Sequence, residues 1–125
     1  MKCLSLEQIL LLHTKIIKST GGSDGVRDLG LIESALKKAE ATFDGQELYE
    51  GNIKKISVTT FALIKNDGFI DGNKRIGVAI MLLLLRLNEI SVKYEQAELV
   101  ELGLKTAAGE FTEENIQQWI EEHQV

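Results

Sequence analysis

The sequence predicts an all-α protein, a single-domain bundle of about six helices around a buried central helix. Apolar residues recur at spacings of three and four along most of the chain, which is the periodicity of helices packed on one face. Alternating apolar and polar runs, which are typical of half-buried strands, are scarce. The 125 residues include no proline to interrupt a helix interior. A chain of this length favours one domain over residues 1–125.

The first two expected helices flank a glycine-rich loop. Ser5 and Gln8 form a capping-box pattern at the start of the first helix. The apolar stripe behind it consists of Leu6, Ile9, Leu10, His13, Ile16 and Ile17. Three glycines between positions 21 and 25 then end this helix in a loop. Asp28 is a candidate N-cap for a second helix, which we expect from about Leu29 to Phe43.

The next two helices are expected to form the middle of the bundle. The third runs from about Asn52 to Lys65, and the central helix begins at Asn73. The central helix contains an unbroken apolar run, Val78–Leu85, and a helix that is apolar on all sides is surrounded by others. Asn88 is a suitable C-terminal cap for it.

Two shorter helices complete the predicted bundle. The segment from Ile90 to Tyr94 is expected to be briefly extended, and a fifth helix follows from about Gln96 to Ala108. The last helix starts at Thr112, with two glutamates in its first turn. Its buried face is expected to carry Ile116, Trp119 and Ile120.

Composition excludes several classes of protein. The net charge of −5 argues against nucleic acid as the main partner, because binding to a phosphate backbone needs clustered Lys and Arg. The longest apolar run is far shorter than the roughly 20 residues that a membrane span needs. The single cysteine, Cys3, permits no intrachain disulfide. The first residues do not resemble a signal peptide, because Glu7 interrupts their apolar stretch, and we therefore expect a cytoplasmic protein.

The turn before the central helix, residues 66–75, concentrates the polar chemistry of the chain. The first N–H groups of a helix have no intrahelical partner and carry partial positive charge. Gly72 permits a close-approach backbone conformation, and successive N–H groups in such a turn form an anion site. Lys74 and Arg75 add two positive charges where the helix dipole disfavours them, and a bound phosphate explains their presence. The alternative is that this segment is only a turn and an N-cap.

Two further residues of the turn have expected roles. Asp71 is placed to hold Mg²⁺, which is usually bound by one or two carboxylates together with substrate phosphates. Phe69, between polar neighbours, is expected to anchor the turn to the core. The segment does not form an EF-hand loop, since Phe69 occupies a ligand position and Val78 stands where the last glutamate belongs.

The segment Phe69–Arg75 resembles the signature of the Fic/Doc (Fido) superfamily, whose core is His-x-Phe-x-Asp/Glu-Gly/Ala-Asn-Gly/Lys-Arg. Lys74 stands where members that transfer AMP carry glycine. In this position the sequence resembles the death-on-curing (Doc) branch. Four other segments, 12–13, 21–28, 30–36 and 107–110, also resemble that branch. The resemblance covers nearly the whole chain and implies the all-helical Fic/Doc fold.

The resemblance implies a toxin of a toxin–antitoxin system, a phosphotransferase that binds ATP and Mg²⁺ in this turn and phosphorylates elongation factor Tu. It also implies a partner antitoxin that covers the site with a helix. Asp71 then corresponds to the metal-binding acid. The nucleotide-binding motif comprises Phe69, Gly72, Asn73, Lys74 and Arg75. Lys74 and Arg75 correspond to the cations that steady the transferring phosphoryl group.

One position departs from the family pattern. The catalytic histidine of the family precedes the phenylalanine by two residues, and here that residue is Asp67, followed by Gly68. Loss of a positioned general base typically slows a reaction about 10²–10⁴-fold. Asp67 can replace the histidine as the base, since protein kinases use an aspartate in that role. However, aspartate is shorter, a second carboxylate repels a triphosphate, and Gly68 is expected to loosen the loop.

Three interpretations follow. The favoured one is a Doc-like toxin that binds nucleotide but whose transferase activity is impaired or absent. The second is a pseudoenzyme that only binds nucleotide or holds an antitoxin helix. The third is an AMP-transferring Fic enzyme. This interpretation is weakened because Val78 stands at the position where AMP-transferring members carry their second arginine.

Two polar positions outside the motif have predicted structural roles. His13 lies on the apolar stripe of the first helix, where a buried, hydrogen-bonded histidine is the common outcome, and a substitute base is the alternative. Arg27 and Asp28 are expected to form an ion pair below the glycine-rich loop.

Overall fold

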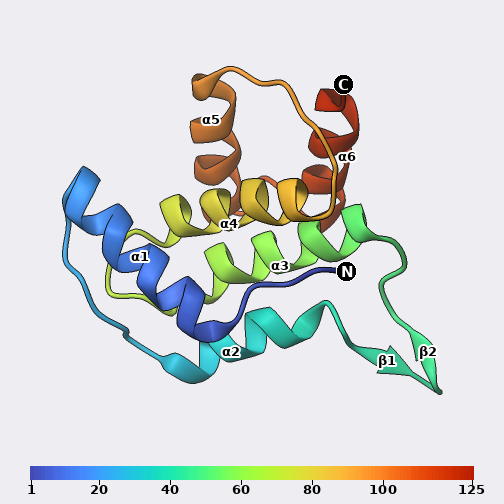
Figure 1. The fold of residues 1–125 in the computed structure, drawn as a ribbon, viewed down its shortest axis with the longest axis horizontal. Helices are drawn as coiled ribbons and strands as arrows, with labels where there is room; N and C mark the ends of the chain where they lie inside the picture. Colours follow the sequence, from blue (N-terminus) through green and yellow to red (C-terminus); the bar gives the residue numbers. More distant parts are fainter.

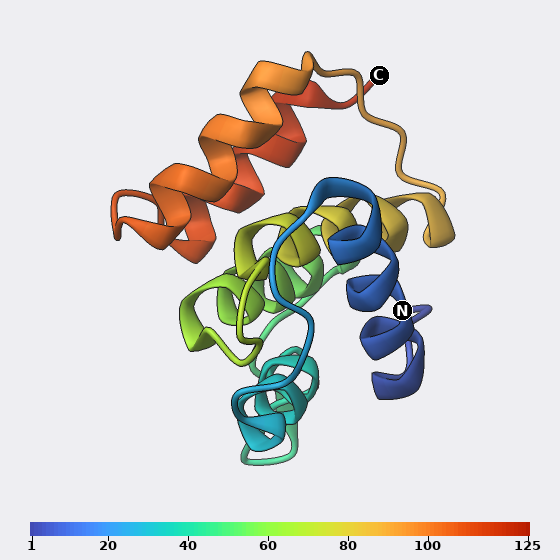
Figure 2. The same cartoon turned by 90° about the vertical axis from the view of Figure 1, so that its left-hand side faces the viewer.

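The computed structural model describes all 125 residues and contains six helices in three layers. The helices are α1 (Leu6–Thr20), α2 (Leu29–Lys38), α3 (Asn52–Asn66), α4 (Asn73–Leu87), α5 (Gln96–Ala107) and α6 (Glu113–His123). Helices α3 and α4 form the middle layer, with α1 and α2 on one side and α5 and α6 on the other (Figure 1; Figure 2). The predicted all-α bundle of six helices is confirmed. None of the helices is both long enough and apolar enough to cross a membrane.

The centre of the bundle is shared by α3 and α4. Helices α2 and α6 pack on α3, α1 packs on α4, and α5 contacts both. The inner face of α4 is fully buried at Ile76, Ile80 and Met81. Its other face, which includes Val78 and Leu82, is only half-buried. The apolar run of α4 is therefore not enclosed on all sides, because part of it lines a groove.

Helix starts match the capping signals in the sequence. The Ser5 hydroxyl accepts from the Gln8 N–H at 3.1 Å, and the Gln8 side chain accepts from the Ser5 N–H, which completes the predicted capping box. Asp28 caps α2 by accepting from the Leu31 N–H at 3.2 Å. Thr112 caps α6 in the same manner. These side chains satisfy donors that a helix cannot satisfy internally.

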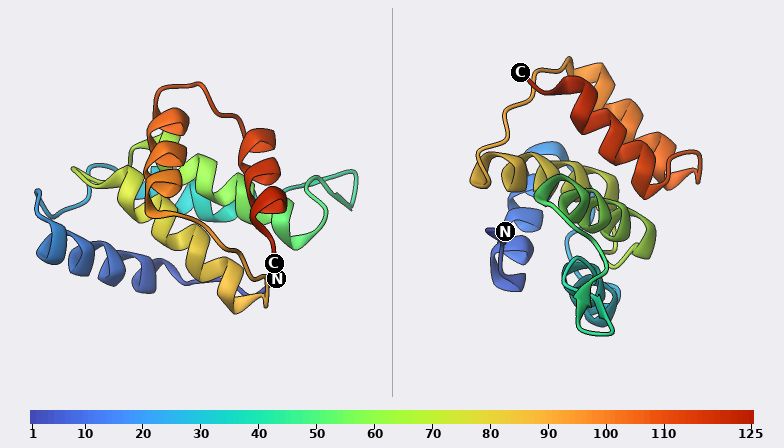
Figure 3. Two further views of the ribbon diagram at one scale, coloured as in Figure 1. Left: turned by 90° about the horizontal axis from the view of Figure 1, so that it is seen from above. Right: turned by 90° about the vertical axis from the view of Figure 1, so that its right-hand side faces the viewer.

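The second helix is shorter than expected. It ends at Lys38, and the following residues form a small hairpin of β1 (Thr42–Phe43) and β2 (Gln46–Glu47) that projects from the bundle (Figure 1; Figure 3). The two residues between the strands, Asp44 and Gly45, have φ of 54° and 77°. An Asp-Gly pair with positive φ at both positions is a strong two-residue hairpin signal, and here it overrides the helical spacing.

The connection from α4 to α5 is extended, as predicted. Val92 forms an isolated antiparallel bridge with Gln124 after the end of α6, and the Lys93 N–H donates to the His123 carbonyl oxygen at 2.9 Å. These contacts attach the C-terminal segment to the α4–α5 connection.

Candidate functional site

The connection between α3 and α4, residues 67–72, lies against the glycine-rich loop that joins α1 to α2. Val26 and Phe69 form an antiparallel bridge between the two segments. The Gly68 carbonyl oxygen accepts from the N–H groups of Arg27 and Asp28, at 2.8 and 2.9 Å. The two segments therefore form a small ribbon of backbone at one end of the molecule.

Arg27 and Asp28 do not form the expected ion pair. The guanidinium of Arg27 donates to the carbonyl oxygens of Asp67 and Asn66, at 2.8 and 3.1 Å, where the last carbonyls of α3 lack helical partners. Asp28 caps α2 instead. Each residue thus stabilises the end of a different helix, and both ends meet at the turn.

Asn73 fastens the turn internally. Its side chain is almost fully buried and contacts the backbone of Phe69 twice: the amide oxygen accepts from the Phe69 N–H and the amide nitrogen donates to the Phe69 carbonyl, both at 3.0 Å. The amide nitrogen also donates to Oδ1 of Asp67 at 2.6 Å. Phe69 itself is buried in the core, as predicted for an anchor. Asn73 therefore offers only its backbone N–H to a ligand.

The start of α4 presents unpaired backbone donors. Gly72 is the N-cap, with left-handed φ and ψ of 79° and 19°, and no side chain caps the helix. The first N–H of this helix with a backbone acceptor belongs to Ile76, which donates to Gly72 at 2.9 Å. The N–H groups of Asn73, Lys74 and Arg75 precede it and remain available. Such donors, together with the dipole of a long helix, suit a phosphate group.

The carboxylate of Asp71 is held in its charged form. Oδ2 accepts from the Ser23 N–H at 3.2 Å, and Oδ1 accepts from the Gly72 N–H at 2.8 Å. These two hydrogen bonds, and then the guanidinium of Arg75 at 3.5 Å, lower the pKa of Asp71 below its ordinary value. No cluster of three or more metal-ligating side chains exists in the chain. A cation here would therefore have at most two protein carboxylates and take its other ligands from phosphate and water, which is the usual pattern for Mg²⁺.

Lys74 and Arg75 differ in their surroundings. Arg75 donates through Nη1 to Thr20 Oγ1 at 2.5 Å and to the Gly21 carbonyl oxygen at 2.7 Å, so it ties the end of α1 to the start of α4. Lys74 is exposed and forms no ion pair or side-chain hydrogen bond. Its ammonium group is free to meet a ligand.

Asp67 lies at the rim of the site in a left-handed conformation. Its φ and ψ are 55° and 45°, a region in which Asp, Asn and His are the favoured residues after glycine. Its side chain accepts the hydrogen bond from Asn73. Gly68, which was expected to loosen the loop, is buried instead: an added Cβ would lie 2.6 Å from Ile32 Cγ1 and 3.2 Å from the Asp28 carbonyl oxygen. The loop is therefore closely packed at this position.

A hollow of about 300 Å³ lies over the turn. It is lined by Ile64, Asp67, Ile70, Asp71, Gly72, Asn73, Lys74, Arg75 and Ala107. Six of the seven predicted site residues line it: Asp67 and the run from Asp71 to Arg75. Phe69 lies beneath, in the core. The sequence did not indicate Ser23 and Thr20 as partners of this site, since only folding brings the end of α1 and its loop to the start of α4.

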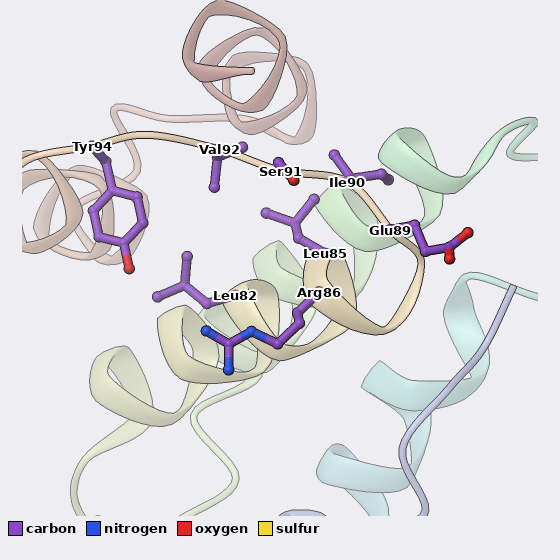
Figure 4. Close-up of a pocket in the computed structure, with 8 residues that line it drawn as sticks. All are labelled: Leu82, Leu85, Arg86, Glu89, Ile90, Ser91, Val92 and Tyr94. Atoms are coloured by element: carbon purple, nitrogen blue, oxygen red, sulfur yellow. The ribbon is translucent and has the colours of Figure 1, made fainter. Parts of the chain in front are cut away.

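An apolar groove of about 370 Å³ begins beside Lys74 and Arg75 and runs between α1, α4 and α5. Its apolar walls include Ile16, Val78 and Leu99. A smaller hollow of about 260 Å³ continues past the shared residues Leu82 and Tyr94 to the far end of α4 (Figure 4). Figure 4 shows the side chains of Leu82, Arg86 and Tyr94 around this second hollow. A continuous surface along α4 thus leads away from the turn.

The fold and the turn define the class of protein. A family model described as the Fic/DOC family matches residues 3–85, and the chain belongs to this family. The chain is 30% identical over 113 residues to the protein kinase doc of Escherichia phage P1, which covers 90% of this chain and 87% of that protein. It is 32% identical over 72 residues to the toxin Doc of Mycolicibacterium smegmatis, covering 58% of this chain and 55% of that toxin. The protein is therefore a Doc-like member of the family.

Proposed function

We propose that this chain is a Doc-like toxin that binds ATP with Mg²⁺ at the turn of residues 67–75 and transfers phosphoryl groups to a protein hydroxyl weakly or not at all. The observation that carries this proposal is the hydrogen bond of 2.6 Å from Asn73 to Oδ1 of Asp67. The phosphate-binding half of the turn is open, whereas the residue at the base position is used to hold the turn.

The residues of the turn fit a nucleotide phosphate chain with one cation. The N–H groups of residues 73–75 and the ammonium of Lys74 would hold the phosphates, and Asp71 would hold Mg²⁺. Bound ATP supplies the phosphoryl group for transfer. Arg75 keeps Asp71 and the end of α1 in place, and its guanidinium lies close enough to the helix start to add positive charge.

Asp67 is poorly placed to accept a proton from a substrate. The oxygen that contacts Asn73 is occupied, and moving it would release the side chain that fastens the Phe69 backbone. No ion pair joins the Asp67 carboxylate to a cation, since the nearby guanidinium of Arg27 donates to the Asp67 carbonyl oxygen instead. A general base also has to lie within hydrogen-bond reach of the proton it takes. Phosphoryl transfer itself relies mostly on positioning and electrostatics, so a weak residual reaction is expected.

The test uses elongation factor Tu, the substrate implied by the resemblance, with ATP labelled at the γ or the α phosphate. Wild type is compared with Asp67→His and Asp67→Asn, both of which suit the left-handed backbone at this position. We expect little transfer by the wild type, no change with Asp67→Asn, and a gain with Asp67→His. Transfer by the wild type that Asp67→Asn abolishes would make Asp67 the base. Transfer of the α label would instead establish AMP transfer.

Nucleotide binding is tested separately by calorimetry with ATP and Mg²⁺. We expect the wild type to bind and the double variant Lys74→Ala with Arg75→Ala to lose most of the affinity. No binding by the wild type, or unchanged binding by the double variant, would refute the proposed site.

A second candidate role is antitoxin binding, which is favoured by the apolar groove beside Lys74 and Arg75. We propose that an amphipathic antitoxin helix with acidic residues near the turn fills this groove, in the cytoplasm where translation takes place. The test is affinity for the product of a small neighbouring gene. Val100→Glu in the groove should weaken binding, whereas Leu11→Glu, at a comparably exposed position of α1 outside it, should not. Equal effects of both variants would contradict binding in the groove.

A further inference from the structure

A buried histidine contacts the candidate site from beneath. His13 of α1 is 1% exposed, and its ring stacks on Phe69 with centroids 3.9 Å apart and an interplanar angle of 15°. Its Nε2 lies 2.7 Å from the carbonyl oxygen of Asp71. A carbonyl oxygen can only accept a hydrogen bond, so Nε2 carries a hydrogen and donates it. His13 is therefore a donor to the turn, which argues against its use as a substitute base.

The other ring nitrogen faces the glycine-rich loop. Nδ1 lies 3.4 Å from Oδ1 of Asp24, which also accepts from the Gly25 N–H at 2.8 Å and from the Thr14 hydroxyl at 3.3 Å. The imidazole thus lies close to both segments of the ribbon that forms the site. Its position is fixed on one edge by the hydrogen bond to Asp71 and on one face by an aromatic ring.

The carbonyl that accepts this hydrogen bond belongs to a peptide unit that the backbone alone leaves adjustable. This peptide unit joins Asp71 to Gly72, and Gly72 has a φ of +79° in a region that glycine enters without steric cost. Glycine permits other values of φ equally well, so the sequence alone leaves the peptide free to rotate. A rotation would turn the Gly72 N–H away from Oδ1 of Asp71 and so release one of the two hydrogen bonds that orient the carboxylate beside the start of α4.

We propose that His13 is the positioning residue of this turn: it holds the Asp71–Gly72 peptide in the orientation that presents the carboxylate and the helix N–H groups on one side. An added Cβ on Gly72 would lie 3.5 Å from Nε2 of His13 and 3.1 Å from Ile17, so α1 also limits the turn sterically. The expected effect of His13 on ATP affinity rests on the nucleotide binding proposed above. The expected effect of His13 on the Asp71–Gly72 backbone does not depend on nucleotide binding.

The test separates the hydrogen bond from the packing. His13→Phe keeps the stack on Phe69 and removes the donor, whereas His13→Gln keeps a donor near the position of Nε2. His123 offers a matched control, because its ring stacks on Trp119 with centroids 3.9 Å apart and contacts the Trp119 carbonyl at 2.6 Å, on α6. Removing a hydrogen bond that orients a metal ligand typically costs about 10–100-fold in affinity.

The first measurement is the dissociation constant for ATP with Mg²⁺. We expect it to rise about tenfold or more for His13→Phe, to recover largely in His13→Gln, and to stay unchanged in His123→Phe. Unchanged affinity in His13→Phe, or an equal loss in His123→Phe, would overturn the proposal. If His13→Phe does not fold, His13→Asn replaces it, because the shorter amide does not reach the Asp71 carbonyl.

The second measurement needs no nucleotide. The N–H groups of Ser23 and Gly72 both donate to Asp71, so their hydrogen exchange reports the orientation of that residue. We expect faster exchange at both amides in His13→Phe and no change in His123→Phe. Unchanged exchange would refute the positioning role even if ATP binds. If the wild type does not bind ATP, the proposed function fails, and the exchange result still decides the role of His13.

Discussion

Two glycines inside helices beside the site should respond in opposite directions to replacement by alanine. Gly77 lies in α4 where that helix packs on α3, and an added Cβ would lie 2.5 Å from Cγ1 of Ile64. Gly103 lies in α5, where an added Cβ would lie 3.5 Å from its nearest neighbours, in ordinary van der Waals contact. The two positions share a helical backbone and differ in the space available.

The expected magnitudes follow from two effects. Alanine is more favourable than glycine inside a helix by about 1 kcal/mol, and this gain applies to both variants. Forcing a methyl group into a packed core costs about 1–3 kcal/mol, and this cost applies only to Gly77→Ala. Gly103→Ala should therefore stabilise the protein by up to about 1 kcal/mol. The free energy of unfolding of Gly77→Ala should be lower than that of Gly103→Ala by about 1–3 kcal/mol.

Urea unfolding of both variants measures this difference in the free energy of unfolding. A further double variant identifies the cause, because Ile64→Ala removes the atom that the new methyl group meets. Gly77→Ala combined with Ile64→Ala should be less destabilised than the sum of the two single changes. Equal stability of Gly77→Ala and Gly103→Ala would refute the close approach of α4 to α3 at this point.

Three other expectations can be checked by unfolding and binding measurements. Burial is the largest single effect on His123 and opposes its protonation, but the hydrogen bonds to Glu98 and to the Trp119 carbonyl and the charges of Glu98 and Glu122 together outweigh it. The pKa of His123 is therefore raised above 6.5, and the hydrogen bond to His123 lowers that of Glu98 below 4.5. The loss of stability in His123→Gln should therefore be largest between about pH 4.5 and 6.5, and should shrink as pH rises through the raised pKa of His123 or falls through the lowered pKa of Glu98. Lys74→Ala should weaken ATP binding without lowering the melting temperature, whereas Arg75→Ala should lower both, because only Arg75 is tied to α1. Gly68→Ala should cost about 1–3 kcal/mol in urea unfolding, and a neutral result would contradict the packing at that turn.

Most helices could be predicted because their signals are local. A capping residue, an apolar stripe and a terminal cap lie within one or two turns of each other, so the sequence alone places α1, α3, α4, α5 and α6 closely. The predicted end of the second helix, at Phe43, is wrong because the apolar spacing of that helix continues past Lys38. The Asp44-Gly45 pair is a local hairpin signal that contradicts this spacing. The predicted ion pair of Arg27 with Asp28 is wrong for a different reason. Asp28 caps α2 locally, whereas Arg27 donates to the carbonyl oxygens of Asn66 and Asp67 at the end of α3, which only the tertiary structure brings near.

The sequence by itself determined the family, the helical class and the residues of the turn before α4, because these depend on a short motif and on local periodicity. Only the tertiary structure decided how that turn is held. It placed the Ser23 N–H on Asp71, the end of α1 on Arg75, and the His13 ring beneath Gly72. It also directed Asp67 toward Asn73. Hydrogen bonds between segments 40 or more residues apart leave no local pattern, because each depends on the packing of α1, α3 and α4 together.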